Sequence, residues 1–370
     1  MPRFDWFFGG LLVYLLALTG SSFESGEIGS YLEVLGRWYL LLLLLIVIWY
    51  TRECGVAGQV AIIRAWTWGV IVMGALAYLG YGLALSGTIT RLVIVYENYP
   101  YFGTVYRSSG VCGGPTALVI LSILPLSYAW RRWRNGEGTP WLLVFLLPIL
   151  LLSFSKEIIL LGLAIFLVDD FVLHRRWLRY VGVAAIASVY WFGTHYIVQP
   201  LQEHTGSYLD GEEFTSGVVV WQGEYLQLLE TSYTALKKAA ISVGKDHPFW
   251  GVGADQFSTY LPAKKAAGIY PEHLPNYIPH STWFGAIAEA GFIGLFGVLV
   301  MVCSVSRRIY QSPKLDVDLC LKSYFIIFAI GAMSMDLLEL RFIWIPIGMV
   351  LGRQLANHQS AVDVSLNRLD

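Results

Sequence analysis

The feature that most constrains the fold is a series of long apolar runs that extends over most of the 370 residues. Hydrophobic side chains make up 56% of the sequence and charged ones only 14%, whereas soluble domains carry about 25% charged residues. Uncharged runs of about 17 to 25 residues are long enough to cross the hydrocarbon core of a bilayer as helices. The sequence therefore predicts an integral membrane protein.

Ten apolar runs have the length and composition expected of transmembrane helices. The fifth and sixth are short, and they flank the polar turn Ser155-Lys156-Glu157. Together the runs predict an all-α fold, a polytopic membrane bundle of about ten transmembrane helices. They lie near residues 6–20, 31–50, 65–86, 114–130, 140–155, 157–173, 178–198, 281–303, 319–335 and 340–356.

Lysine and arginine residues indicate the orientation of the bundle, because they are enriched in cytoplasmic loops. With both termini in the cytoplasm, the inner loops contain the basic groups 131–134, 175–179 and 307–308. The basic residues of the short outer segments are then Arg37, Arg91, Arg107, Lys156 and Arg341. We therefore expect a multi-pass protein with cytoplasmic termini.

Two of the expected outer segments are long, residues 87–113 and 199–280. In the second, apolar residues recur at helical spacing from Gly223 to Lys245, which predicts a helix that stops at Asp246-His247-Pro248. A long ordered loop is usually functional. The predicted organisation is seven membrane helices over 1–198, one large helical extracytoplasmic loop over 199–280, three membrane helices over 281–356 and a cytoplasmic tail over 357–370.

Charged side chains at the outer helix ends are candidates for a functional site, because charge at the membrane boundary is costly unless it is paired or used. Arg107, Lys156 and Arg341 are cations at this level, and both side-chain types suit phosphate oxygens. We therefore predict a pocket for an anion. Structural interpretations stay open, since Lys156 can pair with Glu157 and Arg341 can pair with Glu339.

Arg107 precedes the glycine-rich turn S-S-G-V-C-G-G-P, after which a helix is expected to begin near Thr116. Backbone N–H groups in such a turn approach a ligand closely, and a helix N-terminus favours negative charge. The turn lacks the P-loop pattern. It either cradles a phosphate, or Arg107 extends to lipid headgroups while the glycines only turn the chain.

His280 closes the large outer segment and opens an apolar helix directly after Pro279. A helix N-terminus lowers the pKa of a nearby imidazole and so favours the neutral form, which suits a general base. The alternative is an interfacial histidine bonded to a neighbouring loop. Glu289, nine residues later, falls on the opposite helix face, so we expect it to serve packing, as Gly291 does.

Other functions have little support in the sequence. The net charge of −1 and the scattered basic residues argue against a nucleic-acid partner. His195, His204 and His273 lack partners at metal-ligand spacing, so neither a metal nor another cofactor is predicted. The segment H-P-F-W-G-V-G predicts a tight turn, with Phe249 and Trp250 available to stack on a sugar or on lipid.

Two motifs in this order, D-H-P-F-W-G-V-G-A-D-Q-F and P-H-S-T-W-F-G-A-I-A-E-A-G-F-I-G, resemble the family of bacterial O-antigen ligases and O-antigen polymerases. The segments R-S-S-G-V-C-G-G-P and S-F-S-K-E resemble two further motifs of that family. The matching residues are Arg107, Gly110, Pro115, Pro248, Gly251, Gly253, His280, Glu289, Gly291 and Gly294.

The sequence departs from the family pattern at four positions. Ser281 follows the histidine in place of asparagine, Lys156 replaces an arginine, and Gly114 replaces an asparagine. Tyr233 stands near the position of another family arginine, and Lys237 and Lys238 follow one helical turn later.

The resemblance implies transfer of a glycan from undecaprenyl diphosphate to a hydroxyl of the lipid A core, or of a growing polysaccharide in a polymerase. It implies a bacterial inner membrane protein whose site faces outward. Within it, His280 is expected to be the base, and Arg107, Lys156, Arg341, Lys237 and Lys238 to bind the diphosphate without a metal. The alternatives from other classes are a transporter or flippase of envelope lipids, and a scaffold for envelope assembly.

Overall fold

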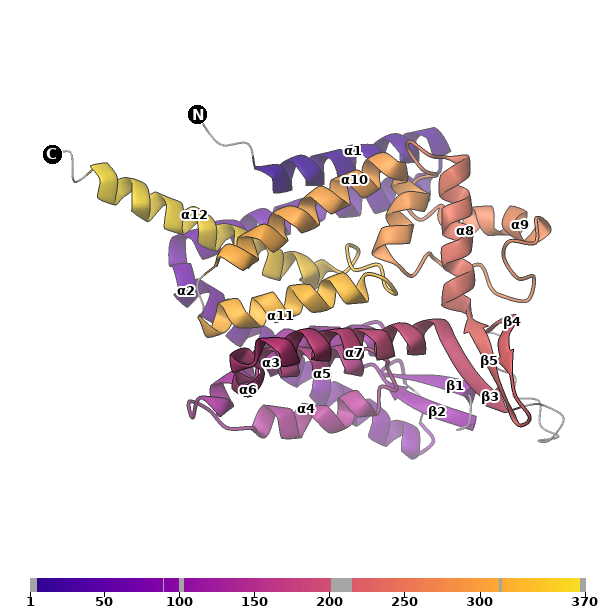
Figure 1. The fold of residues 1–370 in the computed structure, drawn as a ribbon, viewed down its shortest axis with the longest axis horizontal. Helices are drawn as coiled ribbons and strands as arrows, with labels where there is room; N and C mark the ends of the chain where they lie inside the picture. The colour runs from indigo at the N-terminus through magenta and orange to yellow at the C-terminus, as the bar shows by residue number, and fades with distance from the viewer. Residues whose placement is uncertain (1–4, 89, 100–102, 201–214, 313–314, 367–370) are drawn as a thin grey trace. The chain divides into compact units, whose positions relative to one another are not determined.

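The computed structural model describes residues 5–88, 90–99, 103–200, 215–312 and 315–366 (Figure 1). The chain forms two compact units. Unit 1 comprises residues 1–59, 232–313 and 328–370, and unit 2 comprises residues 60–231 and 314–327. Within these described ranges, three helices are long and apolar enough to cross a membrane: Trp6–Ser25, Ile28–Leu85 and Thr282–Gln311.

Unit 1 is helical, and its two most closely packed helices are α1 (Trp6–Ser25) and α10 (Thr282–Gln311). Their backbones touch because glycines face each other: a Cβ on Gly297 would lie 2.6 Å from the Gly10 oxygen. Phe7, Leu11 and Leu18 are buried on the same helix. The other elements of unit 1 are the first half of α2 (Ile28–Leu85), α8 (Ser232–Asp246), α9 (Phe257–Ala266), the end of α11 (Asp316–Gly331), a 3-10 turn (Arg341–Ile343) and α12 (Trp344–Leu366).

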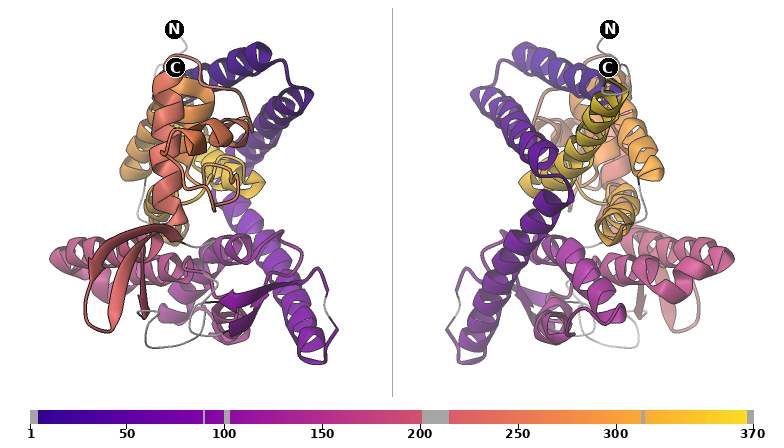
Figure 2. Two further views of the ribbon diagram at one scale, coloured as in Figure 1. Left: turned by 90° about the vertical axis from the view of Figure 1, so that its right-hand side faces the viewer. Right: turned by 90° about the vertical axis from the view of Figure 1, so that its left-hand side faces the viewer.

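Unit 2 combines helices with two small antiparallel sheets. Its helices are the second half of α2, α3 (Pro115–Arg134), α4 (Trp141–Leu151), α5 (Ile158–Val168), α6 (Asp170–His174), α7 (Arg176–His195) and the start of α11. The strands β1 (Val93–Tyr99) and β2 (Gly103–Ser108) form a hairpin in which Ile94 pairs with Arg107. A second sheet, in the order β3-β5-β4, follows α7 (Figure 2). Its strands are β3 (Tyr196–Pro200), β4 (Thr215–Gln222) and β5 (Leu226–Thr231).

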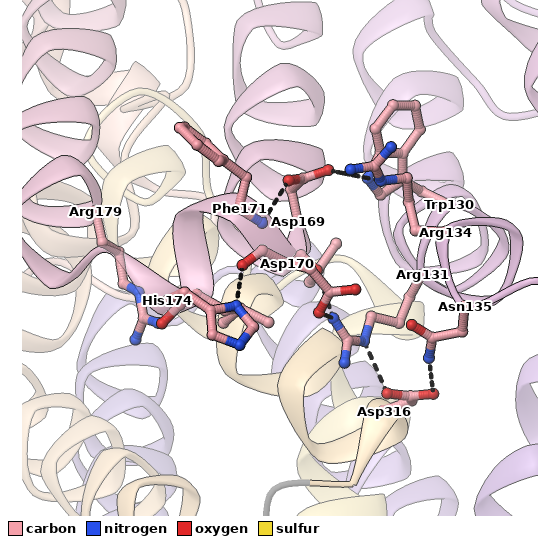
Figure 3. A network of polar contacts seen from close by, with 12 residues as sticks. Trp130, Arg131, Arg134, Asn135, Asp169, Asp170, Phe171, His174, Arg179 and Asp316 are labelled. Carbon is pink, nitrogen blue, oxygen red and sulfur yellow. Dashed lines mark hydrogen bonds and ion pairs between the residues drawn. The ribbon is translucent and has the colours of Figure 1, made fainter.

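A polar network joins the ends of α3, α6 and α11 within unit 2 (Figure 3). Arg131 forms ion pairs with Asp170 and, at 2.7 Å, with Asp316. Asn135 also donates a hydrogen bond to Asp316, at 2.9 Å. Arg131 belongs to a basic group that the sequence assigns to an inner loop. Because its partners lie on two other helices, the network fixes the relative positions of three helix ends.

The structure confirms a mostly helical protein and corrects two details of the prediction. The predicted helices 31–50 and 65–86 lie on either side of a kink at Gly55 (φ 58°, ψ −136°) in α2 and are not among these corrections. The segments that the sequence assigns to the outer face, 87–113 and 199–280, contain strands, so the fold is not purely all-α. Gly223–Lys245 is not one helix: Leu226–Thr231 forms β5, which pairs with β3 and β4, and α8 starts only at Ser232.

The reason for the strand at Leu226–Thr231 lies in the sequence and in the partners of this segment. In L-Q-L-L-E-T the apolar residues satisfy a helical period, yet β3 pairs with the segment in continuous register and β4 pairs with its other edge. The predicted stop at Asp246 is confirmed, because α8 ends there.

Candidate functional site

Arg107 lies at the end of β2 and is held in place by two contacts. Its Nε–H donates a hydrogen bond to the Ser153 carbonyl oxygen at 2.8 Å. Its guanidinium carbon lies 5.0 Å from the ring centroid of Tyr96 on the partner strand. Because the hairpin fixes both strands, the guanidinium has a defined orientation in unit 2.

The turn after Arg107 requires a glycine. Gly110 has a φ of 56°, and a Cβ there would lie 2.9 Å from the Met73 oxygen. Its N–H donates to Leu92 O at 3.0 Å, while the Ser108 hydroxyl donates to Ile149 O at 2.6 Å. α3 then begins at Pro115, a residue suited to a first helical position, which confirms the predicted helix start.

Lys156 lies next to Arg107 in the turn between α4 and α5. The turn is tight, since Phe154 has a φ of 46°. The Nζ atom of Lys156 is buried, and burial lowers the pKa of this ammonium group to about 8, with Glu157 acting against the shift and Arg107 adding to it. Two cations of the predicted anion site therefore lie close together in unit 2.

Glu157 is anchored by hydroxyl groups. Its carboxylate accepts hydrogen bonds from Ser155, from Thr116 at 3.3 Å and from Tyr190 at 3.4 Å. The side chain is buried. These bonds tie the turn that carries Lys156 to the start of α3 and to α7, so Glu157 stabilises the cationic turn in addition to any pairing with Lys156.

His280 lies immediately before the first turn of α10, in unit 1. Its backbone φ of 45° is left-handed, a conformation that non-glycine residues adopt rarely and often at functional positions. The imidazole is flanked by Tyr233, with ring centroids 5.7 Å apart, and by Tyr277, at 5.9 Å. Ser281 is the N-cap of α10, as its side chain accepts from the Phe284 N–H. The predicted position at a helix start is confirmed.

Ser281 and Thr282 bind the segment that follows α11, residues 332–340, which we call the anchor turn. The Ser281 hydroxyl donates to Ala332 O at 2.9 Å. The Thr282 hydroxyl donates to Met335 O at 3.0 Å and accepts from the Leu337 N–H at 2.8 Å. The residue in the place of the family asparagine thus connects the His280 segment to the anchor turn.

The remaining predicted cations of unit 1 differ in their surroundings. Lys237 is buried, and its Nζ lies 5.7 Å from the Phe284 ring, one turn along α8 from Tyr233. Lys238 and Arg341 are exposed. An ion pair between Arg341 and Glu339, the structural alternative for Arg341, is absent among the described residues, where Glu339 pairs with Arg37 of α2.

The two motifs that contain Gly251 and Gly291 dock backbone to backbone. The Val252 and Gly253 N–H groups donate to Ala288 O (2.9 Å) and Glu289 O (3.0 Å). In return, the Phe292 N–H donates to Pro248 O at 2.8 Å. α10 is interrupted at Gly291 (φ 64°, ψ −167°), which releases the donors and acceptors that this docking uses. Glu289 is buried here, in agreement with a packing role.

Replacing Gly251 or Gly291 with alanine is expected to reduce stability strongly. Both have positive φ, and the new Cβ would lie 2.4 Å from the carbonyl carbon of Glu289 or 2.3 Å from Phe249 O. A left-handed alanine and the overpacking together predict a loss of about 2 to 5 kcal/mol in the free energy of unfolding. Thermal unfolding in detergent measures the effect, and Gly162→Ala, which meets no atom within 4 Å, is the matched control. Equal midpoints for Gly291→Ala and Gly162→Ala would contradict the docking.

The sequence does not show that Tyr233 and Tyr277 lie beside His280. It also does not show that Arg37, predicted only as an outer cation, forms ion pairs with Glu33 and Glu339. For Arg37 the available signal is the occurrence of a lone arginine in an apolar run, which is costly without a partner.

The structure places the predicted residues in both units. Arg107, Gly110, Pro115 and Lys156 belong to unit 2, whereas His280, Lys237, Lys238, Arg341 and the glycine motifs belong to unit 1. A single pocket that joins the two groups stays a prediction. Among the described residues, no group of three histidine, cysteine or acidic side chains is arranged to hold a metal ion. His204 lies outside the described residues.

Long apolar helices with polar clusters at their ends define a helical membrane protein. Residues 141–299, from α4 into α10, match the family model described as O-antigen ligase. The match confirms the family resemblance of the sequence, and it contains Lys156, Lys237, His280 and Gly291. No curated protein sequence matches the chain.

Proposed function

We propose that the protein is a lipid-linked glycan transferase of the O-antigen ligase type. The observation that carries the proposal is His280, an imidazole in a left-handed position before α10, within the segment that matches O-antigen ligase. The proposed donor is a glycan on undecaprenyl diphosphate, and the proposed acceptor is a hydroxyl group of the lipid A core. The site faces outward from the bacterial inner membrane in this proposal.

The proposed reaction is one in-line displacement. His280 accepts the proton of the acceptor hydroxyl while its oxygen attacks the anomeric carbon of the donor. The bond from that carbon to the phosphate oxygen breaks, and undecaprenyl diphosphate leaves with the bonding electrons. Single displacement inverts the configuration at the anomeric carbon. The negative charge that develops on the leaving group is balanced by cations, so no metal is needed for this step.

The cations divide into two groups in this proposal. Arg107 and Lys156 of unit 2, which lie together, provide the principal diphosphate contacts. Lys237, Lys238 and Arg341 of unit 1 add positive charge on the side of His280. Of these three residues, Lys237 is the best supported as a cation near His280, because it follows Tyr233 on the face of α8 that contacts the start of α10.

Ligase and polymerase share this chemistry and differ in the acceptor. The test is a transfer assay with purified protein in proteoliposomes that contain the undecaprenyl-diphosphate glycan and, separately, lipid A core or a second copy of the glycan lipid. We expect glycan on lipid A core. Chain elongation alone identifies the polymerase, and movement of the glycan lipid across the bilayer without transfer contradicts the proposal in favour of a flippase.

The Lys156 ammonium group predicts a pH dependence of donor use. Its lowered pKa of about 8 means that the charge is present below this pH and is lost as the pH rises through it. We expect kcat/KM for the donor, which reports the free enzyme, to fall about tenfold above pH 8. Lys156→Arg should remove this fall, because a guanidinium stays protonated. Lys245→Arg, at an exposed position, is the control. An identical alkaline profile for Lys156→Arg and wild type would contradict the assignment.

A further inference from the structure

The conformation of His280 requires support from outside its own helix. A residue with a φ of 45° costs free energy unless the surrounding structure holds it. Ser281 and Thr282, the two residues that follow, make five hydrogen bonds to the anchor turn over Ala332, Met335 and Leu337. The position of the imidazole therefore depends on where the anchor turn lies.

The anchor turn is itself internally rigid. The Asp336 carboxylate accepts from the Leu338 N–H at 3.1 Å, and the Leu340 N–H donates to Leu337 O at the same distance. The indole N–H of Trp344, at the start of α12, donates to Leu338 O at 3.1 Å. A movement at one end of the turn is therefore transmitted to the carbonyl groups that bind Thr282.

An ion pair between Glu339 and Arg37 connects the anchor turn to α2. Its carboxylate lies 2.5 Å from Nη2 of Arg37, a residue 302 positions earlier in the chain. The Arg37 side chain is only 3% exposed, and its Nε also lies 3.3 Å from Glu33. Because the Arg37 side chain is buried, its charge loses compensation when Glu339 moves away, so this contact resists separation.

Arg37 is poorly placed to bind a phosphate. Two carboxylates already engage its guanidinium, and both pairing partners are protein groups within unit 1. Among the described carboxylates, Asp336 adds further negative potential around it. Its chemistry is that of a fixed structural cation, which distinguishes it from Arg107 and Lys156.

We infer that Arg37 and Glu339 form a positioning pair for His280, acting through the anchor turn and the Ser281-Thr282 step. The inference rests on the proposed function for its catalytic consequence, because it assigns the pair to the orientation of the base. Neither residue contacts the reacting atoms in this scheme. Ser281 connects the anchor turn to His280, so the serine that replaces the family asparagine has a positioning role.

The experiment measures His280 directly by its rate of acylation with diethylpyrocarbonate, read by mass spectrometry on the full-length protein in detergent. The variants are Arg37→Gln and Glu339→Gln. We expect both to change the His280 rate severalfold while exposed His273, the internal reference, keeps its rate. Glu33→Gln is the matched control, because it removes a carboxylate from Arg37 and leaves the Arg37–Glu339 pair intact.

The second readout is transfer activity. Misplacing a base by about 1 Å costs on the order of a hundredfold in rate, so kcat should fall by about tenfold or more while donor KM stays within about twofold. The exchanged variant Arg37→Glu with Glu339→Arg should restore part of kcat and the His280 rate. It also keeps the test decisive if the single variants do not fold.

Two results would overturn the inference: an unchanged His280 rate in both glutamine variants, or a parallel change at His273, which indicates general loosening. The result is different if the proposed function is wrong. In that case the wild-type protein transfers no glycan, while the acylation rates still decide whether the pair positions His280.

Discussion

Replacing His280 with alanine is expected to lower glycan transfer by about a hundredfold to ten-thousandfold, the range typical of a lost general base. The physical reason is that the acceptor hydroxyl keeps its proton unless a neutral imidazole receives it. The loss should appear in kcat, with donor KM nearly unchanged, because His280 acts on the acceptor and the cations bind the donor. Initial rates of transfer to lipid A core measure both parameters.

His273→Ala is the matched control for this variant, since His273 is exposed and belongs to the same segment, residues 199–280. His280→Gln is a second useful variant, because it retains a polar side chain of similar size but cannot accept the proton effectively. Transfer at the wild-type rate in both His280 variants would exclude a catalytic role and leave the interfacial interpretation of this histidine.

The helices of this protein were predictable because each depends on a local pattern. The apolar runs near 6–20 and 281–303 correspond to α1 and α10, and Asp246-His247-Pro248 marks the end of α8. His280 was predictable for the same reason, because the change from a polar segment to an apolar helix is visible within a few residues. Orientation and the number of membrane crossings remain predictions from charge and length.

Strand β5 was missed because one of its two partner strands is distant in sequence. Leu226–Thr231 pairs with Tyr196–Pro200 in β3, about thirty positions earlier, and nothing within the segment itself reports that pairing. The hairpin of Val93–Tyr99 and Gly103–Ser108 is different, because its two strands follow each other closely in the sequence. The apolar residues of L-Q-L-L-E-T do have helical spacing, but the backbone hydrogen bonds to the neighbouring strands determine its conformation.

The support of His280 was beyond sequence reasoning for a related cause. Arg37 and Glu339 are 302 residues apart, and the hydrogen bond from Ser281 to Ala332 spans 51. A pattern within one segment cannot show that two such segments meet. The motif glycines Gly251 and Gly291 were recognisable individually, yet their reciprocal docking became apparent only from the backbone hydrogen bonds of residues 248–253 and 288–292.

Replacing Arg107 with glutamine is expected to lower kcat/KM for the glycan donor by about a hundredfold to a thousandfold, the cost of removing one preorganised charge that stabilises the leaving group. Among the described residues, the hydrogen bond to Ser153 O uses only the Nε–H of the guanidinium. The two Nη groups then present a fork that matches two phosphate oxygens. Tyr96 fixes the plane of this fork from the neighbouring strand.

The variant Arg107→Lys distinguishes the effect of the positive charge from the effect of the guanidinium geometry. An ammonium group supplies the charge but not the fork, and it does not reproduce the bond from Nε to Ser153, so we expect an intermediate loss of about tenfold. Arg91→Gln is the control, because Arg91 is an exposed arginine of the same segment, residues 87–113. Donor titrations at increasing salt provide an independent check, as a lost phosphate contact weakens the salt dependence of donor KM. If Arg107→Gln and Arg91→Gln have the same kcat/KM, Arg107 does not bind the diphosphate, and its contacts with Tyr96 and Ser153 serve only to close the hairpin against α4.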